Sequence, residues 1–177
     1  TAFWQVNLEQ DVVIDHVVVI FQKGNTSQRK QQKRRNGYSI IVTDSPTYLP
    51  MTSANTCYND KDPDLSAENH ENRSCSIIGK YVTIYNQRKT LSGPNYSKNA
   101  VLELCEVHVM GCPLTKYGTE CKEDCPENCK NRLCFPRNGT CMKGCSPGYL
   151  PPKCGQGFQT KKKRFLNWLF ENSIGEV

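Results

Sequence analysis

The sequence lacks several features that would assign it quickly to a class. It contains no apolar run near the length of about 18 residues that a transmembrane helix needs, so we expect no membrane-spanning segment. It has neither an initiator methionine nor a signal peptide, and residues 1–8 already read as a strand, so we expect the chain to begin within a domain of a longer parent protein. It has no phosphate-binding glycine loop or metalloprotease motif, and no recognisable nucleophile lies near His16, His70 or His108, so we do not expect an enzyme.

Cysteine is scarce at first and then abundant. Of the 11 cysteines, those that precede residue 112 are Cys57, Cys75 and Cys105. The others crowd into residues 112–154, a stretch too short and too poor in aliphatic residues to fold by hydrophobic burial alone. This pattern predicts a disulfide-stapled module outside the reducing cytosol. Zinc binding is the competing use of these thiols, and the absence of close Cys-x-x-Cys pairs and of histidine partners disfavours it.

Four N-glycosylation sequons also suit a secreted chain. They begin at Asn25, Asn72, Asn95 and Asn138. Together with the cysteines, they indicate an extracellular location, either as a secreted protein or as the ectodomain of a membrane receptor.

The net charge of +6 arises from two local clusters of basic residues. One cluster lies in 23–35 and the other in 161–164, and the remainder of the chain is mildly acidic. Such clusters usually belong to solvated loops and tails, and a heparin or phosphate patch is the alternative. We expect no nucleic-acid partner.

Hydrophobic periodicity predicts an all-β first domain. The expected strands are 3–8, 12–21, 38–43, 77–85 and 101–110. Residues 12–21 are apolar on nearly both faces, which fits a central strand covered on both sides, and Trp4 is expected to fill the core. The strands are separated by polar loops at 23–36 and 44–76, and no helical pattern occurs. An antiparallel β-sandwich is therefore predicted.

The chain divides into three regions: a sandwich at 1–110, a cysteine-rich module at 111–155 and a basic, amphipathic tail at 156–177. In the first region a bridge between Cys57 and Cys75 would close an acidic loop and stabilise it by roughly 3 kcal/mol. The tail places Phe165, Leu166, Leu169 and Phe170 on one helical face. It is favoured as a disordered tail, with an anionic membrane surface as the alternative location.

Several motifs resemble a known family. Trp4 to Leu8, Val12 to Ile20, Gly79 to Tyr85 and Leu102 to Val109 are similar, in order and spacing, to the second half of a fucolectin domain, the F-type lectin jelly roll related to the discoidin sandwiches. The cysteine-rich stretch resembles the laminin-like EGF repeats of multiple-EGF scavenger-type receptors.

The fucolectin resemblance implies a sugar site in which a histidine and two arginines hold fucose. A guanidinium suits this task because its planar fork donates to vicinal hydroxyls. The histidine would lie upstream of this chain. The first arginine position is occupied by Gln22, and the second matches Arg34, with Arg35 as a slip of one residue.

The resemblance also implies calcium in the intact parent domain. The family's last strand contributes a carbonyl and a carboxylate, which match Cys105 and Glu106 here. Calcium takes six to eight oxygen ligands, so we expect no tight site in this chain. In the family the Cys105 position bridges to a cysteine of the upstream half. We therefore expect Cys105 to be the unpaired thiol of an odd set.

By resemblance to EGF order, the expected bridges of the module are Cys112–Cys121, Cys125–Cys134, Cys129–Cys141 and Cys145–Cys154. The first would be the closing loop of a preceding partial repeat. Spacing alone does not fix such connectivity.

The function that the resemblance implies is extracellular recognition of carbohydrate, in particular of fucosylated glycans in innate recognition or adhesion, with the EGF array as a spacer. The rival interpretation is a scavenger-receptor-like ectodomain whose degenerate lectin fold serves contacts with extracellular proteins. Gln22 and the basic loop favour the rival, and the scaffold motifs favour the lectin. The absence of the first strands is expected to expose sheet edges and lower solubility.

Overall fold

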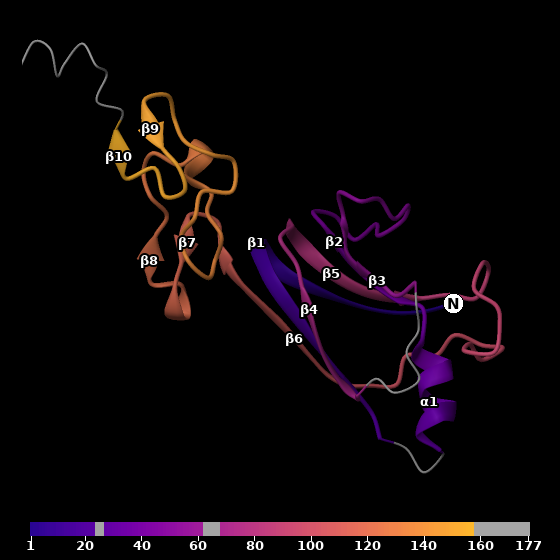
Figure 1. Cartoon of the computed structure of the whole chain (residues 1–177). Helices are drawn as coiled ribbons and strands as arrows, with labels where there is room; N and C mark the ends of the chain where they lie inside the picture. The colour runs from indigo at the N-terminus through magenta and orange to yellow at the C-terminus, as the bar shows by residue number, and fades with distance from the viewer. Residues whose placement is uncertain (24–26, 62–67, 158–177) are drawn as a thin grey trace, which may run out of the picture.

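The computed structural model describes residues 1–23, 27–61 and 68–157, which form a β-sandwich followed by a small disulfide-rich module (Figure 1). The sandwich contains β1 (Ala2–Phe21), α1 (Gln28–Arg35), β2 (Tyr38–Thr43), β3 (Thr56–Asn59), β4 (His70–Ser74), β5 (Ile78–Asn86) and β6 (Leu104–Pro113). The module contains β7 (Lys116–Tyr117), η1 (Thr119–Cys121), β8 (Glu123–Asp124), η2 (Lys130–Arg132), β9 (Tyr149–Leu150) and β10 (Gln156–Gly157). The prediction of an all-β sandwich with a disulfide-rich module is confirmed.

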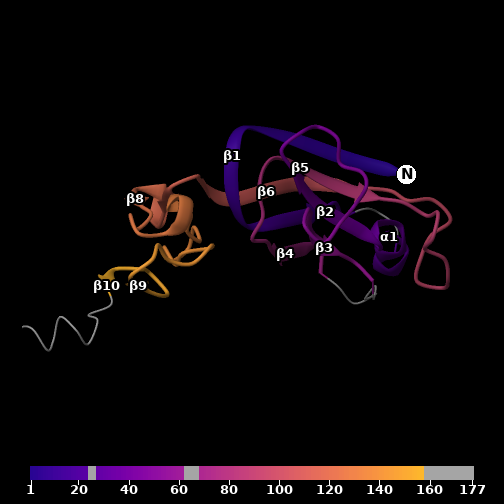
Figure 2. The same ribbon diagram turned by 90° about the horizontal axis from the view of Figure 1, so that it is seen from above.

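Strand β1 runs through both layers of the sandwich. The strand order is β3-β2-β5-β1-β4, with β6 also paired to β1, and every pairing is antiparallel. The first part of β1 pairs with β5, and the second part lies between β4 and β6. The β5 ladder is interrupted between Asn7 and Val12, where Glu9 has φ 67°, and Figure 2 shows β1 curving there from one layer into the other. The sequence predicted two strands because this irregularity breaks the alternation of side chains without ending the strand.

The core lies between the layers. Val17, Val19 and Phe21 of β1 are buried, whereas His16 and Val18 on the opposite face of the strand are half-buried. The second part of β1 is therefore a central strand, as predicted, with one face buried and the other partly covered. Strand β2 is buried on both faces.

Three elements appear where loops were predicted. Helix α1 lies in the basic segment 23–36, and β3 and β4 lie in 44–76. Helix α1 has no apolar stripe, since its buried residues are Gln31, Gln32 and Arg35, so hydrophobic periodicity does not reveal it. Its Gln, Lys and Arg residues nevertheless favour helix. Strands β3 and β4 are short and polar, and the Cys57–Cys75 disulfide links β3 to the residue after β4.

The module continues directly from β6. Strand β6 begins and ends later than the predicted 101–110, so the expected domain boundary at residue 110 falls inside it. Cys112 still pairs with Val13 of β1 and is bridged to Cys121. The sandwich therefore passes into the module through a hydrogen-bonded strand. Figures 1 and 2 both show the module at one end of the sandwich and α1 at the other.

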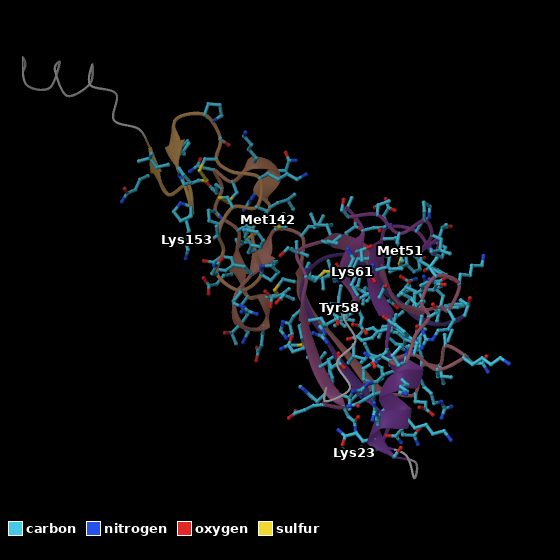
Figure 3. All side chains as sticks on the ribbon, turned by 45° about the vertical axis from the view of Figure 1, so that its right-hand side comes forward. Lys23, Met51, Tyr58, Lys61, Met142 and Lys153 are labelled. Carbon is cyan, nitrogen blue, oxygen red and sulfur yellow. A yellow bond between two sulfur atoms is a disulfide. The ribbon has the colours of Figure 1, made fainter. Side chains whose placement is uncertain are left out.

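The disulfides join the pairs that the sequence analysis expected, and Cys105 is a free, exposed cysteine. The bridges are Cys57–Cys75, Cys112–Cys121, Cys125–Cys134, Cys129–Cys141 and Cys145–Cys154. Buried cysteines make up the core of the module, where Figure 3 shows the yellow sulfur atoms. Within the described residues, no helix is long and apolar enough to cross a bilayer. Of the expected tail at 156–177, Gln156 and Gly157 form β10, and residues 158–177 lie outside the described residues.

Candidate functional site

Two residues of the expected sugar site, Gln22 and Arg34, both contact Glu103. The backbone N–H of Gln22 donates to the carbonyl oxygen of Glu103 over 2.7 Å. The guanidinium of Arg34 lies 2.7 Å from the carboxylate of the same glutamate, and both side chains of this ion pair are about one-third exposed. Helix α1 and the segment before β6 therefore bring Gln22 and Arg34 together at the end of the sandwich, where Figure 3 also shows Lys23 beside the helix.

Arg35 points to a different part of the molecule from Arg34. Successive residues of a helix point about 100° apart, so the two arginines reach different neighbours. Arg35 is 3% exposed, donates to the side chain of Asn69 and the carbonyl of Glu68, and lies 4.5 Å from the centre of the Phe21 ring. Burial lowers the pKa of its guanidinium, and this effect is opposed by the carboxylate of Glu71, 3.6 Å away.

Arg35 forms part of the wall of a cavity of about 450 Å³, which we call the polar cleft. Its lining residues come from the end of α1, from β2, from β3 and from β4. They are Arg35, Asn36, Tyr38, Tyr58, Asp60, Glu68, His70, Glu71, Asn72 and Arg73. Tyr58 and Lys61, both labelled in Figure 3, mark the side of the sandwich where β3 ends. Side chains of both charge signs and aromatic rings share this lining, and such a surface can both donate and accept hydrogen bonds.

A hydrogen-bonded network crosses the polar cleft between the layers. The hydroxyl of Tyr38 donates to Glu71 over 2.7 Å, and Arg73 donates to the same carboxylate and, from Nε, to the Tyr38 oxygen. The Arg73 guanidinium lies 4.0 Å from the centre of the Tyr58 ring. These contacts hold three side chains in one arrangement.

Burial is the largest influence on the pKa values of Tyr38, Tyr58 and Arg73. Burial, assisted by the charge of Glu71, raises the pKa of Tyr38. Burial and then Asp60 raise the pKa of Tyr58 to about 12. Burial by itself lowers the pKa of Arg73, but the contacts with Tyr38 and Glu71 outweigh it and raise that pKa. Both tyrosines are therefore neutral at physiological pH, and Arg73 is charged.

A second, larger cavity of about 960 Å³ adjoins the polar cleft, since both are lined by Glu68 and His70. Cys105 contributes to its wall. Glu106, the other residue of the expected calcium pair, is not among the residues that line this cavity, and its carboxylate lies 3.2 Å from the imidazole of His108. Cys105 and Glu106 are neighbours on a strand, so their side chains leave opposite faces.

The residues present do not fit a calcium shell. Among residues 1–23, 27–61 and 68–157, the group of three potential metal ligands found together consists of Cys129, Cys141 and Cys154, and each of these sulfur atoms belongs to a disulfide. One carboxylate and one carbonyl fall short of the six to eight oxygens that calcium takes. Among the described residues, Cys105 and Glu106 alone therefore do not make a calcium site.

Sequence reasoning missed Tyr38, Glu71 and Arg73 as cavity residues. Residues 44–76 were assigned to a loop, and Tyr38 was assigned to a strand without a polar role. Alternation within His70–Ser74 was an available signal, because Glu71 and Arg73, at alternate positions of a short strand, share one face.

In comparisons with protein-family models, with curated proteins and with solved structures, no match to this chain was found.

Proposed function

We propose that this chain is an extracellular recognition module of the fucolectin type, which binds fucosylated glycans, with its EGF-like module as a spacer. The observation that supports this proposal is the meeting of Gln22 and Arg34 at Glu103. These two positions are those that the family resemblance assigns to the sugar, and Gln22 reaches Glu103 through its backbone N–H. Arg34 carries a planar set of donors, which suits vicinal hydroxyls.

The architecture is compatible with the proposal. The strand β1 shared between layers is compatible with a lectin-type sandwich, and the five disulfides are compatible with an extracellular or secreted protein. The module lies at the end of the sandwich opposite α1, so further repeats would extend away from the proposed sugar site (Figure 1). Such a placement leaves the site open to a ligand.

A glycan array with the whole secreted chain tests this function. We expect binding to fucosylated glycans that Arg34→Ala weakens by about ten- to a hundredfold, because hydrogen bonds to a charged group contribute about 1.5–3 kcal/mol. Arg29→Ala is the matched control, since Arg29 is an exposed arginine on the same helix. Equal loss in both variants would refute a specific role for Arg34.

One observation favours a second function. The guanidinium of Arg34 is already paired with Glu103, and Gln22 stands where the family has an arginine, which suits a lectin fold that has lost sugar binding and contacts extracellular proteins instead. The same array distinguishes the two functions. Absence of binding to every glycan, together with saturable binding to a protein of an extracellular panel, would support this second function and overturn the first.

A further inference from the structure

One sequon lies on the exposed strand β4. Asn72 and Ser74 of Asn72-Arg73-Ser74 are both exposed and alternate with the inward-facing Glu71 and Arg73. Within the part of the chain that the structure describes, β4 pairs with β1 alone, so it is an edge strand. The acceptor asparagine therefore stands in the middle of a sheet edge.

The backbone of Asn72 faces the side of β4 on which no described strand pairs. The N–H of Cys75 donates to Asp15 and the carbonyl of Asn69 accepts from Phe21, so these odd-numbered positions point their polar groups toward β1. Successive residues of a strand alternate in this respect, and Asn72 therefore turns its N–H and C=O away from β1. Unpaired backbone N–H and C=O groups of this kind can form hydrogen bonds with a strand of another chain.

The other sequons are placed differently. Asn95 is half-buried and its carbonyl accepts a hydrogen bond from Asn36, while the hydroxyl of Ser97 donates to the carbonyl of Asn99. Asn138 is exposed but lies in the module, where its side chain accepts from the N–H of Thr140. Asn25 lies outside the described residues. Among the described sequons, Asn72 combines an exposed acceptor with an open sheet edge.

The surroundings of Asn72 would benefit from a hydrophilic cover. Asn72 pairs with Val18 of β1, and Val18 pairs on its other side with His108 of β6. Met110 on the same strand as His108 is 47% exposed. Asn72 also lines the polar cleft, so a group attached to it would stand at the rim of that cavity.

We propose that Asn72 carries an N-linked glycan, which covers the open edge of β4 and prevents other chains from pairing with it. The bond forms between Nδ2 of Asn72 and C1 of the first sugar of a lipid-linked oligosaccharide pyrophosphate. The amide nitrogen gives up one proton, and the lipid pyrophosphate leaves. The disulfides place the chain in a compartment compatible with this chemistry. The inference does not depend on sugar binding at Arg34.

Peptide mapping tests the modification directly. The whole chain is secreted from animal cells, and its glycans are removed by an amidase in water labelled with oxygen-18, which converts each glycosylated asparagine into labelled aspartate. We expect the label at Asn72 in most molecules. An unlabelled Asn72 in correctly folded, secreted protein would overturn the proposal.

A matched pair of variants tests the role of the glycan. Ser74→Ala destroys the sequon, whereas Ser74→Thr keeps it, and both change an exposed side chain. We expect light scattering to show several-fold more self-association for Ser74→Ala than for Ser74→Thr or for Asn138→Gln. Trimming the glycans of the folded wild-type chain with an endoglycosidase, which leaves one sugar on each asparagine and changes no residue, should raise self-association in the same direction. Equal self-association of all these samples would show that the glycan does not protect the edge.

Discussion

Arg137 of the disulfide-rich module donates a hydrogen bond from Nη2 to Oδ2 of Asp15 on β1, over 2.8 Å. The same carboxylate oxygen lies 2.6 Å from Nδ1 of His16. A second connection runs through β6, whose Cys112 is bridged to Cys121. The module is therefore held against the sandwich by a continuous strand and by a charged contact at its side.

Arg137→Ala tests whether the charged contact orients the module. Because Arg137 is 70% exposed, its ion pair contributes at most about 1 kcal/mol, and we expect little change in the free energy of unfolding. We do expect a wider range of orientations between module and sandwich, measured by residual dipolar couplings. Arg132→Ala, an exposed arginine elsewhere in the module, is the control. Identical couplings in wild type and Arg137→Ala would show that β6 alone fixes the orientation.

The junction should also weaken in acid. Burial raises the pKa of Asp15, but the hydrogen bonds with His16 and Arg137 outweigh it and lower that pKa below its ordinary value. Since the folded-state pKa lies below the unfolded one, the contribution of Asp15 to stability is complete above about pH 4 and is lost as the pH falls through the lowered pKa. We expect the difference in unfolding free energy between wild type and Asp15→Asn to shrink over that range. A difference that stays constant with pH would contradict this assignment.

Gly111 allows β6 to approach β1 where the sandwich meets the module. A Cβ added there would lie 2.3 Å from the carbonyl oxygen of Val13 and 3.0 Å from Cα of Ile14, and both are backbone atoms that side-chain motion cannot relieve. We expect Gly111→Ala to destabilise the chain by about 1–3 kcal/mol in denaturant unfolding, as overpacking does. Gly155→Ala is the control, because an added Cβ there meets nothing within 4 Å. Equal stability of the two variants would refute this packing argument.

Much of the fold was predictable because it is encoded locally. The alternation of Val17, Val19 and Phe21 marks a core strand, and residues 38–43 and 77–85 were assigned closely to β2 and β5. The four cysteine pairs of the module followed from the EGF resemblance, and Cys57–Cys75 from the loop that these two cysteines bracket. Helix α1 was not predicted, because its buried face is polar and includes the fully buried Gln32. Hydrophobic periodicity detects only helices with an apolar face.

The candidate site was less predictable because it depends on contacts that are distant in sequence. The sequence indicated Gln22 and Arg34, but the role of Glu103 requires the segment before β6 to reach α1. The network of the polar cleft joins Tyr38 of β2 to Glu71 of β4, and only the stacking of two layers brings them together. Local patterns carry no information on such pairs.

The carboxylate of Glu71 is the centre of the polar cleft, and its removal should be the most damaging change there. It is 8% exposed and accepts from Tyr38 and Arg73, with Arg35 3.6 Å away. Glu71→Gln keeps the shape but leaves two guanidinium groups facing a neutral amide, and breaking a buried charge pair costs about 3–5 kcal/mol. We expect a loss of that order in denaturant unfolding.

Glu103→Gln is the matched control for Glu71→Gln, since Glu103 also pairs with an arginine but is about one-third exposed. Its substitution should cost less than about 1 kcal/mol, because water screens an exposed pair. Tyr38→Phe separates the charge of Glu71 from its hydrogen bond, since it removes one donor and leaves both arginines in place. We expect Tyr38→Phe to fall between the two glutamate variants. Equal losses for Glu71→Gln and Glu103→Gln would show that burial does not strengthen the network.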